Sequence, residues 1–444
     1  MNPPKDKIDK SLKSSFFDAM CYGGMMGFTQ DYFIPFLLLL GGNARYVGVL
    51  SSLPNLAAAL VQLKSADLAE KIKSRHKVIT FFVLLQALML FPMAWLAYAG
   101  GGHPVLFIIL VTLFTSMGAF VIPAWGSLMS NLVSEKKRGE FFGKRNLVTG
   151  ILMVSASFIA GFILHVMQKI NIYQGFAIIF MGAGLCRLLS WYFLTQLYEL
   201  PLEHKKEHYF NVYMFLSRIK QSNFAKFVLF VSLFNFSVYL ASPFFSVLML
   251  RELHFGYLLY TMITVTATVT VYLMMGRWGK HADKVGNLKV MKMTAPIIAI
   301  LPLLWVINRQ PLFLMGVQII SGFAWAGFNL CASNFIFDAV TPEKRTRCIA
   351  YFNVFNGLAL CCGALIGGFL IEHLPPFWGY KILTLFLISS ALRLMAALVL
   401  PQKLKEVRPV EPISSNRLFF SMIGLKPVLP MEPKSDTALV KSLD

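Results

Sequence analysis

Charged residues are scarce in this sequence. Asp, Glu, Lys and Arg together make up 14% of the 444 residues, whereas an average soluble domain carries about 25%. Hydrophobic residues make up 57%, and 40 residues are Phe. This balance excludes an ordinary water-soluble domain and predicts a chain that lies mostly inside a membrane.

Short catalytic motifs are also missing. The chain contains no His-Glu-x-x-His zinc motif, no Gly-x-Ser-x-Gly nucleophile elbow and no Gly-Lys-Ser/Thr phosphate loop. The lack of a phosphate loop argues against a built-in ATP drive. We therefore expect no enzymatic activity and no cofactor.

Cysteines are few and dispersed, without a Cys-x-x-Cys pair or a nearby cluster of His. We interpret them as small apolar residues and expect neither a disulfide framework nor a metal site. The six are Cys21, Cys186, Cys331, Cys348, Cys361 and Cys362.

Long hydrophobic runs, by contrast, recur along the whole chain. Each can cross a hydrocarbon core of about 30 Å as a helix, whereas the strands of a membrane barrel need only about ten alternating residues. The sequence therefore predicts an all-α membrane protein with twelve spans. They cover 16–40, 46–63, 78–99, 105–130, 147–167, 174–197, 225–250, 256–275, 290–307, 312–337, 348–374 and 380–400.

The formal charge of +20 would suggest nucleic acid in a soluble protein, but its placement indicates lipid. When twelve spans are threaded, nearly all Lys and Arg fall on the side that holds both termini. The positive-inside rule then predicts a multi-pass protein of the inner or plasma membrane with both termini in the cytoplasm. The positive charge should lie near anionic lipid headgroups, and we expect no binding to nucleic acid. The exceptions on the other side are Arg45, Lys169, Arg251, Arg309 and Lys381.

Two stretches of the chain repeat each other at an offset of 207 residues. A repeat of this length in a membrane protein indicates a transporter built from two halves around one central site. The matching pairs are Arg138 and Arg345, Asn146 and Asn353, Gly150 and Gly357, Gly161 and Gly368, and Phe162 and Phe369.

The repeat divides the chain into five parts. We expect a monomer whose tails and linker are cytoplasmic. The linker contains an amphipathic stretch, 210–218, which is either a helix on the membrane surface or a solvated helix. The parts are an N-terminal tail 1–13, a six-helix bundle 14–198, a linker 199–224, a second six-helix bundle 225–400 and a C-terminal tail 401–444.

The loop after the eighth span carries a specific pattern. Gly279 is followed after three residues by Asp283 and Lys284, and Gly286 follows one residue later. This resembles the loop signature of the major facilitator superfamily, which joins the second and third spans and recurs between the eighth and ninth. The resemblance implies two six-helix bundles around a central cavity and gradient-driven transport of small solutes.

The first copy of this pattern is degraded. Ala66 replaces the Gly and Glu70 replaces the Asp, followed by Lys71 and, after an insertion, Arg75. A carboxylate between basic residues can pair with a neighbouring helix and hold a gate shut. The alternative is an ordinary positive-inside loop.

The Gly-Pro pair of many drug–proton antiporters and the sugar-porter Pro-Glu-Ser-Pro-Arg pattern are both missing, so no subfamily is assigned.

Gln30 and Asp31 lie inside the first span. A carboxylate there costs at least about 2.5–3.5 kcal/mol, so it needs a cavity, a partner or a proton. We predict that Asp31 couples transport to a proton or cation. The first and seventh spans repeat at an offset of 208, so its repeat mate is Tyr239, near Asn235. The alternative is an inert Asp at the outer interface.

The geometry of the resembled family would line its cavity with spans one, four, seven and ten. That implies Trp125, Trp325 and Asn329 as further substrate contacts, and aromatic rings beside polar groups suit an amphipathic or sugar-like ligand. The alternative is that these rings only pack. For Asp18 at the inner end of the first span, and for Arg187 and Arg393, we expect interfacial or structural roles.

Together these features predict a secondary active transporter, a symporter or antiporter, that moves a small solute by alternating access. Two alternatives remain. One is an exporter of amphiphiles, drugs or lipids with the same fold. The other is a membrane sensor on a transporter scaffold that signals through its tail.

Overall fold

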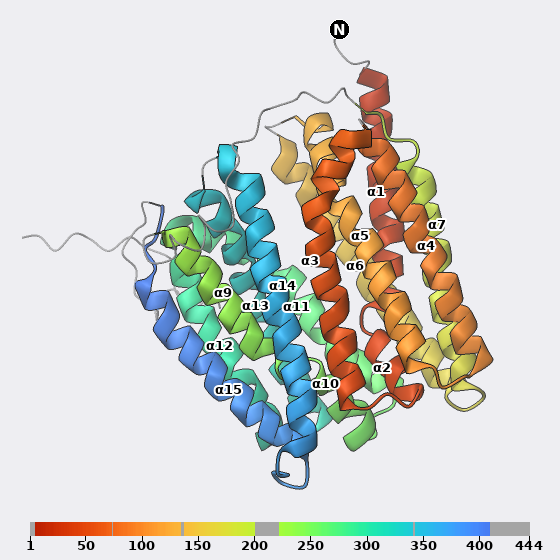
Figure 1. Cartoon of the computed structure of the whole chain (residues 1–444), viewed down its shortest axis with the longest axis vertical. Helices are drawn as coiled ribbons and strands as arrows, with labels where there is room; N and C mark the ends of the chain where they lie inside the picture. Colours follow the sequence, from red (N-terminus) through yellow and green to blue (C-terminus); the bar gives the residue numbers. More distant parts are fainter. Residues whose placement is uncertain (1–4, 73, 135–136, 200–221, 341, 409–444) are drawn as a thin grey trace, which may run out of the picture.

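The computed structural model describes residues 5–72, 74–134, 137–199, 222–340 and 342–408. These residues are almost entirely helical (Figure 1). In chain order the elements are α1 (Lys5–Thr29), α2 (Phe33–Leu39), α3 (Ala44–Ile72), α4 (Arg75–Ala99), α5 (Pro104–Leu132), α6 (Arg138–Met167), α7 (Ile172–Leu194), α9 (Asn223–Tyr239), α10 (Phe244–Val247), the π-helix η2 (Leu248–Glu252), α11 (Tyr257–Val285), α12 (Asn287–Ile307), α13 (Pro311–Ala339), α14 (Pro342–His373), α15 (Lys381–Val399) and the 3-10 helix η3 (Leu400–Lys403).

Eleven segments of the described chain are long and apolar enough to cross a membrane. The twelfth span is the pair α1 and α2, which is interrupted in its middle and charged at its beginning. The predicted fold of twelve membrane helices in two halves is therefore confirmed. Linker residues 200–221 and tail residues 409–444 lie outside the described part of the chain.

The first span of each half is broken at the same place. A turn at residues 30–32 separates α1 from α2, and a turn at 240–243 separates α9 from α10. Pro35 and Pro243 lie at these turns or just after them. A proline has no N–H to donate to the carbonyl four residues earlier. The carbonyl group of Asp31 is thereby released from the helix, and the Tyr260 hydroxyl donates to it at 2.8 Å.

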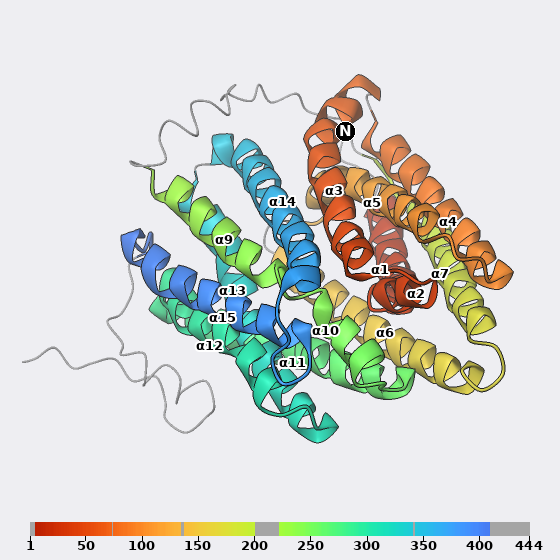
Figure 2. The ribbon, with the colours of Figure 1, turned by 60° about the horizontal axis from the view of Figure 1, so that its bottom comes forward.

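The helices form two groups, α1–α7 and α9–α15 (Figure 2). The groups meet along two seams, where α3 packs against α14 and α6 packs against α11. In both seams the second span of one half contacts the fifth span of the other. We call the end of the molecule where α1 begins and α15 ends the terminal face, and the opposite end the far face (Figure 1).

The repeated glycines lie in these seams. A Cβ atom on Gly357 would lie 2.8 Å from the Ala59 Cβ, and one on Gly368 would lie 2.9 Å from the Ala44 carbonyl oxygen. Gly150 faces Tyr272 on α11 in the same way, since an added Cβ would lie 2.6 Å from the ring. Small residues let membrane helices approach closely. The repeat noticed in the sequence therefore marks the surfaces where the halves meet.

Candidate functional site

A cavity of about 1120 Å³ lies between the two halves. Its walls include residues of the first, fourth, seventh and tenth spans, as the family resemblance implies. All seven residues predicted to contact substrate or coupling ion line this cavity. They are Gln30, Asp31, Trp125, Asn235, Tyr239, Trp325 and Asn329.

Toward the far face, polar contacts between the halves close the cavity. Arg45 on α3 forms an ion pair with Glu372 on α14. Arg251 on η2 donates to the Gly42 carbonyl at 3.1 Å. Toward the terminal face the two groups of helices diverge (Figure 1), and the cavity wall reaches as far as Arg145 near the start of α6. The cavity is therefore closed at the far face and extends toward the terminal face.

Asp31 lies where the halves meet. Its carboxylate accepts a hydrogen bond from the Ser157 hydroxyl at 3.2 Å. The adjacent Tyr32 is fully buried, donates to the Ser157 carbonyl at 2.6 Å and lies 2.8 Å from the hydroxyl oxygen of Thr261 on α11. Among the described ion pairs none involves Asp31.

The other half contributes polar and aromatic groups to the cavity. Asn235 donates to the side chain of Asn356 at 2.7 Å. Trp325 contacts the ring of Phe234, with 6.5 Å between ring centroids. Asn329, one turn further along α13, is exposed and lines the cavity. These side chains can offer amide hydrogen bonds and flat apolar surface to a solute.

A charged network that the sequence did not predict lines the N-terminal half of the cavity. Arg145 donates to one carboxylate oxygen of Asp18, and the Ser190 hydroxyl donates to the other, both at 2.7 Å. Arg187 donates to Ser190 at 2.9 Å and to Gln86 at 2.8 Å. Asp18 therefore pairs directly with Arg145 and is linked to Arg187 only through the Ser190 hydroxyl.

The structure places Asp18 deeper than the sequence predicts and adds Arg145 to the cavity wall. The sequence places Asp18 at the membrane interface, but it is only 3% exposed and pairs with Arg145. In the sequence Arg145 follows directly on the basic loop. Since α6 already begins at Arg138, Arg145 lies about two helical turns inside, where its guanidinium also lies over the Trp125 ring at 4.1 Å.

Arg393, the repeat mate of Arg187, is held differently. It is also 3% exposed, and its three guanidinium nitrogens donate to the Ser389 hydroxyl and to the carbonyl groups of Ile298 and Val238. These contacts join α15 to α12 and α9. Arg393 therefore has the contacts of a structural residue, and it also places a positive charge in the cavity wall.

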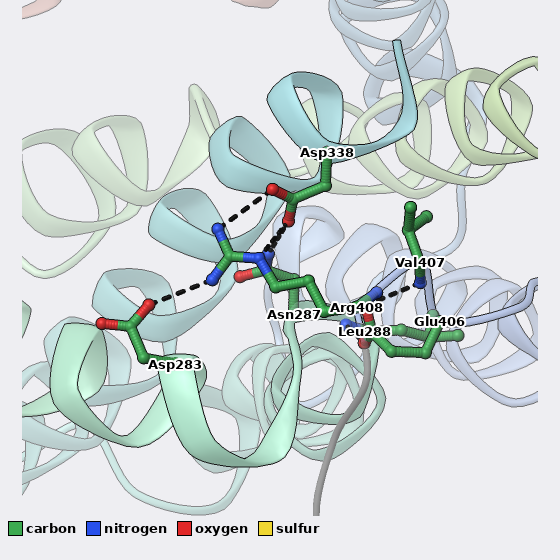
Figure 3. A network of polar contacts seen from close by, with 7 residues as sticks. All are labelled: Asp283, Asn287, Leu288, Asp338, Glu406, Val407 and Arg408. Carbon is green, nitrogen blue, oxygen red and sulfur yellow. Dashed lines mark hydrogen bonds and ion pairs between the residues drawn. The ribbon is translucent and has the colours of Figure 1, made fainter. Parts of the chain in front are cut away.

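The specific loop motif lies at the terminal face. Gly286 is the single residue between α11 and α12 and has a φ of 90°, which favours glycine. Asp283 pairs with Arg408 at 3.0 Å, and Arg408 also pairs with Asp338 at 2.7 Å (Figure 3). The segment after η3 thus holds this loop, and all these contacts lie within the second half.

Glu406 in the same segment caps α12, since its carboxylate accepts from the Leu288 backbone N–H at 2.7 Å (Figure 3). Gly279 and Lys284 flank this region on α11, where Gly279 approaches Leu330 of α13 and Lys284 is exposed. The tail predicted from residue 401 onward therefore begins with an ordered segment that ends, in the described chain, at Arg408.

The degraded copy of the motif is capped in the same way. The side chains of Ala66 and Glu70 lie outside the described residues, and Lys71 is exposed. Glu199 accepts hydrogen bonds from the backbone N–H of Arg75 and from the Ser74 hydroxyl, both at 2.6 Å. Partial burial raises the pKa of the Glu199 carboxyl, but these hydrogen bonds outweigh it and hold the pKa below its usual value.

Glu199 and Glu406 are 207 residues apart, the offset of the repeat. Each follows the last helix of its half and caps the third span of that half. The sequence contains this signal, but neither residue stands out in it because both lie in segments that read as linker or tail. The repeat offset alone could have revealed this capping pair.

Comparison with known proteins agrees with this architecture. The family model described as Major Facilitator Superfamily matches residues 15–307 and 227–435. A solved structure of a mutant of the nucleoside transporter NupG is similar over 90% of this chain and 100% of its own, with 15% identity and a TM-score of 0.70.

A second solved structure has the same fold. It is a bacterial homologue of the human lysosomal transporter Spinster, inward-facing and unoccupied, with 12% identity and a TM-score of 0.61 over 91% of this chain and 100% of its own. No curated protein sequence matches the chain. These identities show the fold alone, whereas the family model covers most of the chain. The chain belongs to the major facilitator superfamily.

Proposed function

We propose that this protein is a secondary active transporter that carries a small solute across a membrane by alternating access. The observation that carries the proposal is one large cavity between two repeated halves, sealed at the far face by contacts between those halves. Rocking of the halves would open that seal and close the terminal face.

We further propose that the terminal face is cytoplasmic and that the protein acts as a monomer in the inner or plasma membrane. The concentration of Lys and Arg on this side supports the orientation. In that orientation the structure corresponds to an inward-open state. The seam glycines support rocking, because they have no side chain of their own to interlock with the facing helix.

Asp31 is the proposed coupling residue. Its backbone carbonyl bonds to Tyr260 of the other half, while its carboxylate faces the cavity. Protonation would remove a negative charge beside the contacts that join α1, α6 and α11. The equilibrium between inward-open and outward-open states would then depend on proton concentration on both sides.

The loops at the terminal face are the proposed inner gate, with Asp283 and Lys284 at its rim. The Asp283–Arg408 pair supports this role, because it fixes the loop as part of the second half. When the halves approach, that loop would meet the first half as a formed surface. Arg408 thereby competes with basic groups of the first half for the Asp283 carboxylate.

Spin-label distances can test alternating access without a known solute. In a cysteine-free variant in nanodiscs, labels at 137 and 280 report across the terminal face, and labels at 169 and 310 report across the far face. Labels at 77 and 137 lie in one half and serve as the control pair. Arg45→Ala combined with Arg251→Ala removes the far-face contacts.

We expect the double variant to lengthen the far-face distance and shorten the terminal-face distance, while the control distance stays the same. Opposite changes at the two faces are the signature of rocking. If the far-face contacts can be removed without any change at the terminal face, alternating access by rocking is wrong for this protein.

A further inference from the structure

The described cavity wall carries more positive than negative charge. Its ionisable lining groups of fixed sign are three arginines, Arg145, Arg187 and Arg393, and two aspartates, Asp18 and Asp31. We propose that the transported solute is a singly charged organic anion with a ring-bearing apolar body, and that a proton is carried with it. This inference rests on the proposed transport function.

The network in the N-terminal half holds two arginines and one aspartate. A guanidinium stays protonated in proteins, so it must be balanced by a partner. Arg145 is balanced by Asp18. The described hydrogen bonds of Arg187 go to Ser190 and Gln86, which are uncharged. One positive charge in this half therefore has no carboxylate of its own.

The second half adds another positive charge. The nitrogens of Arg393 bond only to carbonyl and hydroxyl oxygens among the described residues. Asp31 is the remaining carboxylate in the wall. With Asp31 ionised the wall holds one positive charge in excess, and with Asp31 protonated it holds two. In a medium of low dielectric constant this excess attracts an anion.

The proton and the anion must then help each other to bind. Protonation of Asp31 removes the negative charge that competes with the solute for the arginines. Linkage requires the converse as well, so anion binding must favour protonation by the same factor. The geometry therefore points to symport of an anion with a proton rather than exchange.

The apolar body is inferred from the aromatic rings in the wall. Trp125 lies beneath Arg145, and Tyr22 lies beneath Arg187 with 5.1 Å from the guanidinium carbon to the ring centroid. Trp325 faces the cavity from the other half. Cations above rings create places where a carboxylate and a flat body can be bound side by side. The volume accommodates a drug-sized molecule, for which pockets of about 300–1000 Å³ are usual.

Matched sets of ligands that differ only in charge can test this inference. Purified protein in dodecyl maltoside is heated with 2-naphthoate, 2-naphthamide or 2-naphthylmethylammonium, and with the corresponding indole-3-acetate, indole-3-acetamide and tryptamine. We expect at least one carboxylate to raise the melting temperature, and its amide and amine to raise it less. Greater stabilisation by amides or amines, or none by either carboxylate, would overturn the inference.

Variants of arginine locate the binding site. Arg187→Gln should weaken carboxylate binding by about tenfold or more, because hydrogen bonds between charged groups are the strong ones. Arg187→Lys keeps the charge and should retain part of the binding. Arg309→Gln is the matched control, since Arg309 stacks on Tyr380 outside the cavity wall. Unchanged carboxylate binding in folded Arg187→Gln would refute the assignment.

Proton uptake tests the proposed coupling. When the binding carboxylate is added to weakly buffered wild-type protein, the protein should take up protons from the solution. The Asp31→Asn variant should not. Release of protons, or equal uptake by the variant, contradicts symport. If the spin-label distances respond as proposed but no carboxylate binds, this inference fails and alternating access stands. If a carboxylate binds but the distances do not respond, the anion site stands and alternating access by rocking fails.

Discussion

The hydroxyl oxygen of Tyr32 lies 2.8 Å from that of Thr261, and this contact joins the two halves at the break in the first span. Tyr32 also lies 2.6 Å from the Ser157 carbonyl, and Thr261 lies 2.8 Å from the Tyr257 carbonyl. Two hydroxyl protons thus serve three close contacts. One of the three contacts is therefore without a proton of its own, and the Tyr32 hydroxyl links the two halves directly.

Tyr32→Phe should therefore shift the equilibrium toward the outward-open state. The change removes the hydroxyl that reaches both Ser157 and Thr261, and the net contribution of such a hydrogen bond is about 0.5–1.5 kcal/mol. The spin-label pair at 169 and 310 should report a larger fraction of long distances. Thr261→Val tests the same link from the other side, and an unchanged distribution in both variants would show that the link carries no weight.

Asp31→Asn should abolish the pH dependence of the conformational equilibrium. An amide of similar shape cannot bind or release the proposed coupling proton. Distance distributions across both faces, measured between about pH 5 and 8, check this expectation. Glu252→Gln, an exposed carboxylate change on η2, is the control. A variant that still responds to pH as the wild type does would exclude Asp31 as the coupling group.

Gly48→Ala should destabilise the protein through the seam between α3 and α14. The new Cβ would lie 2.7 Å from the Ala364 carbonyl oxygen, which belongs to the backbone and cannot turn away. Overpacking of this kind costs about 1–3 kcal/mol. Gly126→Ala on α5 is the matched control, because its Cβ meets no atom within 4 Å. Thermal unfolding should show a lower melting temperature for Gly48→Ala only.

Glu199→Gln should destabilise the protein in a pH-dependent manner. The pKa of Glu199 is held below its usual value, so the carboxylate contributes stability above its unfolded pKa of about 4.3 and loses it as the pH falls through the folded pKa. The variant should melt below the wild type at pH 7 and approach it below about pH 4. An equal deficit at both pH values would mean that charge is not involved.

Shortening of the chain tests the segment that holds the second loop motif. A protein ending at Arg408 retains every described contact to Asp283 and Asp338. A protein ending at Lys403 also loses the Glu406 cap of α12, worth about 0.5–2 kcal/mol. We expect a lower melting temperature for the shorter protein alone. Equal stability would show that Arg408 and Glu406 do not secure this loop.

Hydrophobic runs predicted the helices because each run must cross the same apolar layer. The cavity residues Trp325 and Asn329 were predicted from a family geometry that the helices reproduce. The pair of Asp18 and Arg145 was not predicted, because the two residues are 127 positions apart in the sequence. Charge at a helix end resembles charge in a loop until the helix boundary is known, and only the observed start of α6 places Arg145 inside.

The breaks in the first and seventh spans were not predicted, although the sequence contains a signal for them. Pro35 and Pro243 occupy matching places in the repeat, and each removes a backbone donor from its helix. What the sequence could not supply is the acceptor's new partner. The Tyr260 hydroxyl that bonds to the Asp31 carbonyl comes from another span, and such a match depends on tertiary packing.

The two seams are made from the same pair of surfaces used twice, since the second span of each half packs on the fifth span of the other. A surface that complements itself under a twofold rotation is the mark of an isologous dimer. A single ancestral half would already possess both sides of this interface. Fusion of two duplicated genes would then need only a connecting linker, and Asp31 and Tyr239 could diverge afterwards without disturbing the contact that holds the pair together.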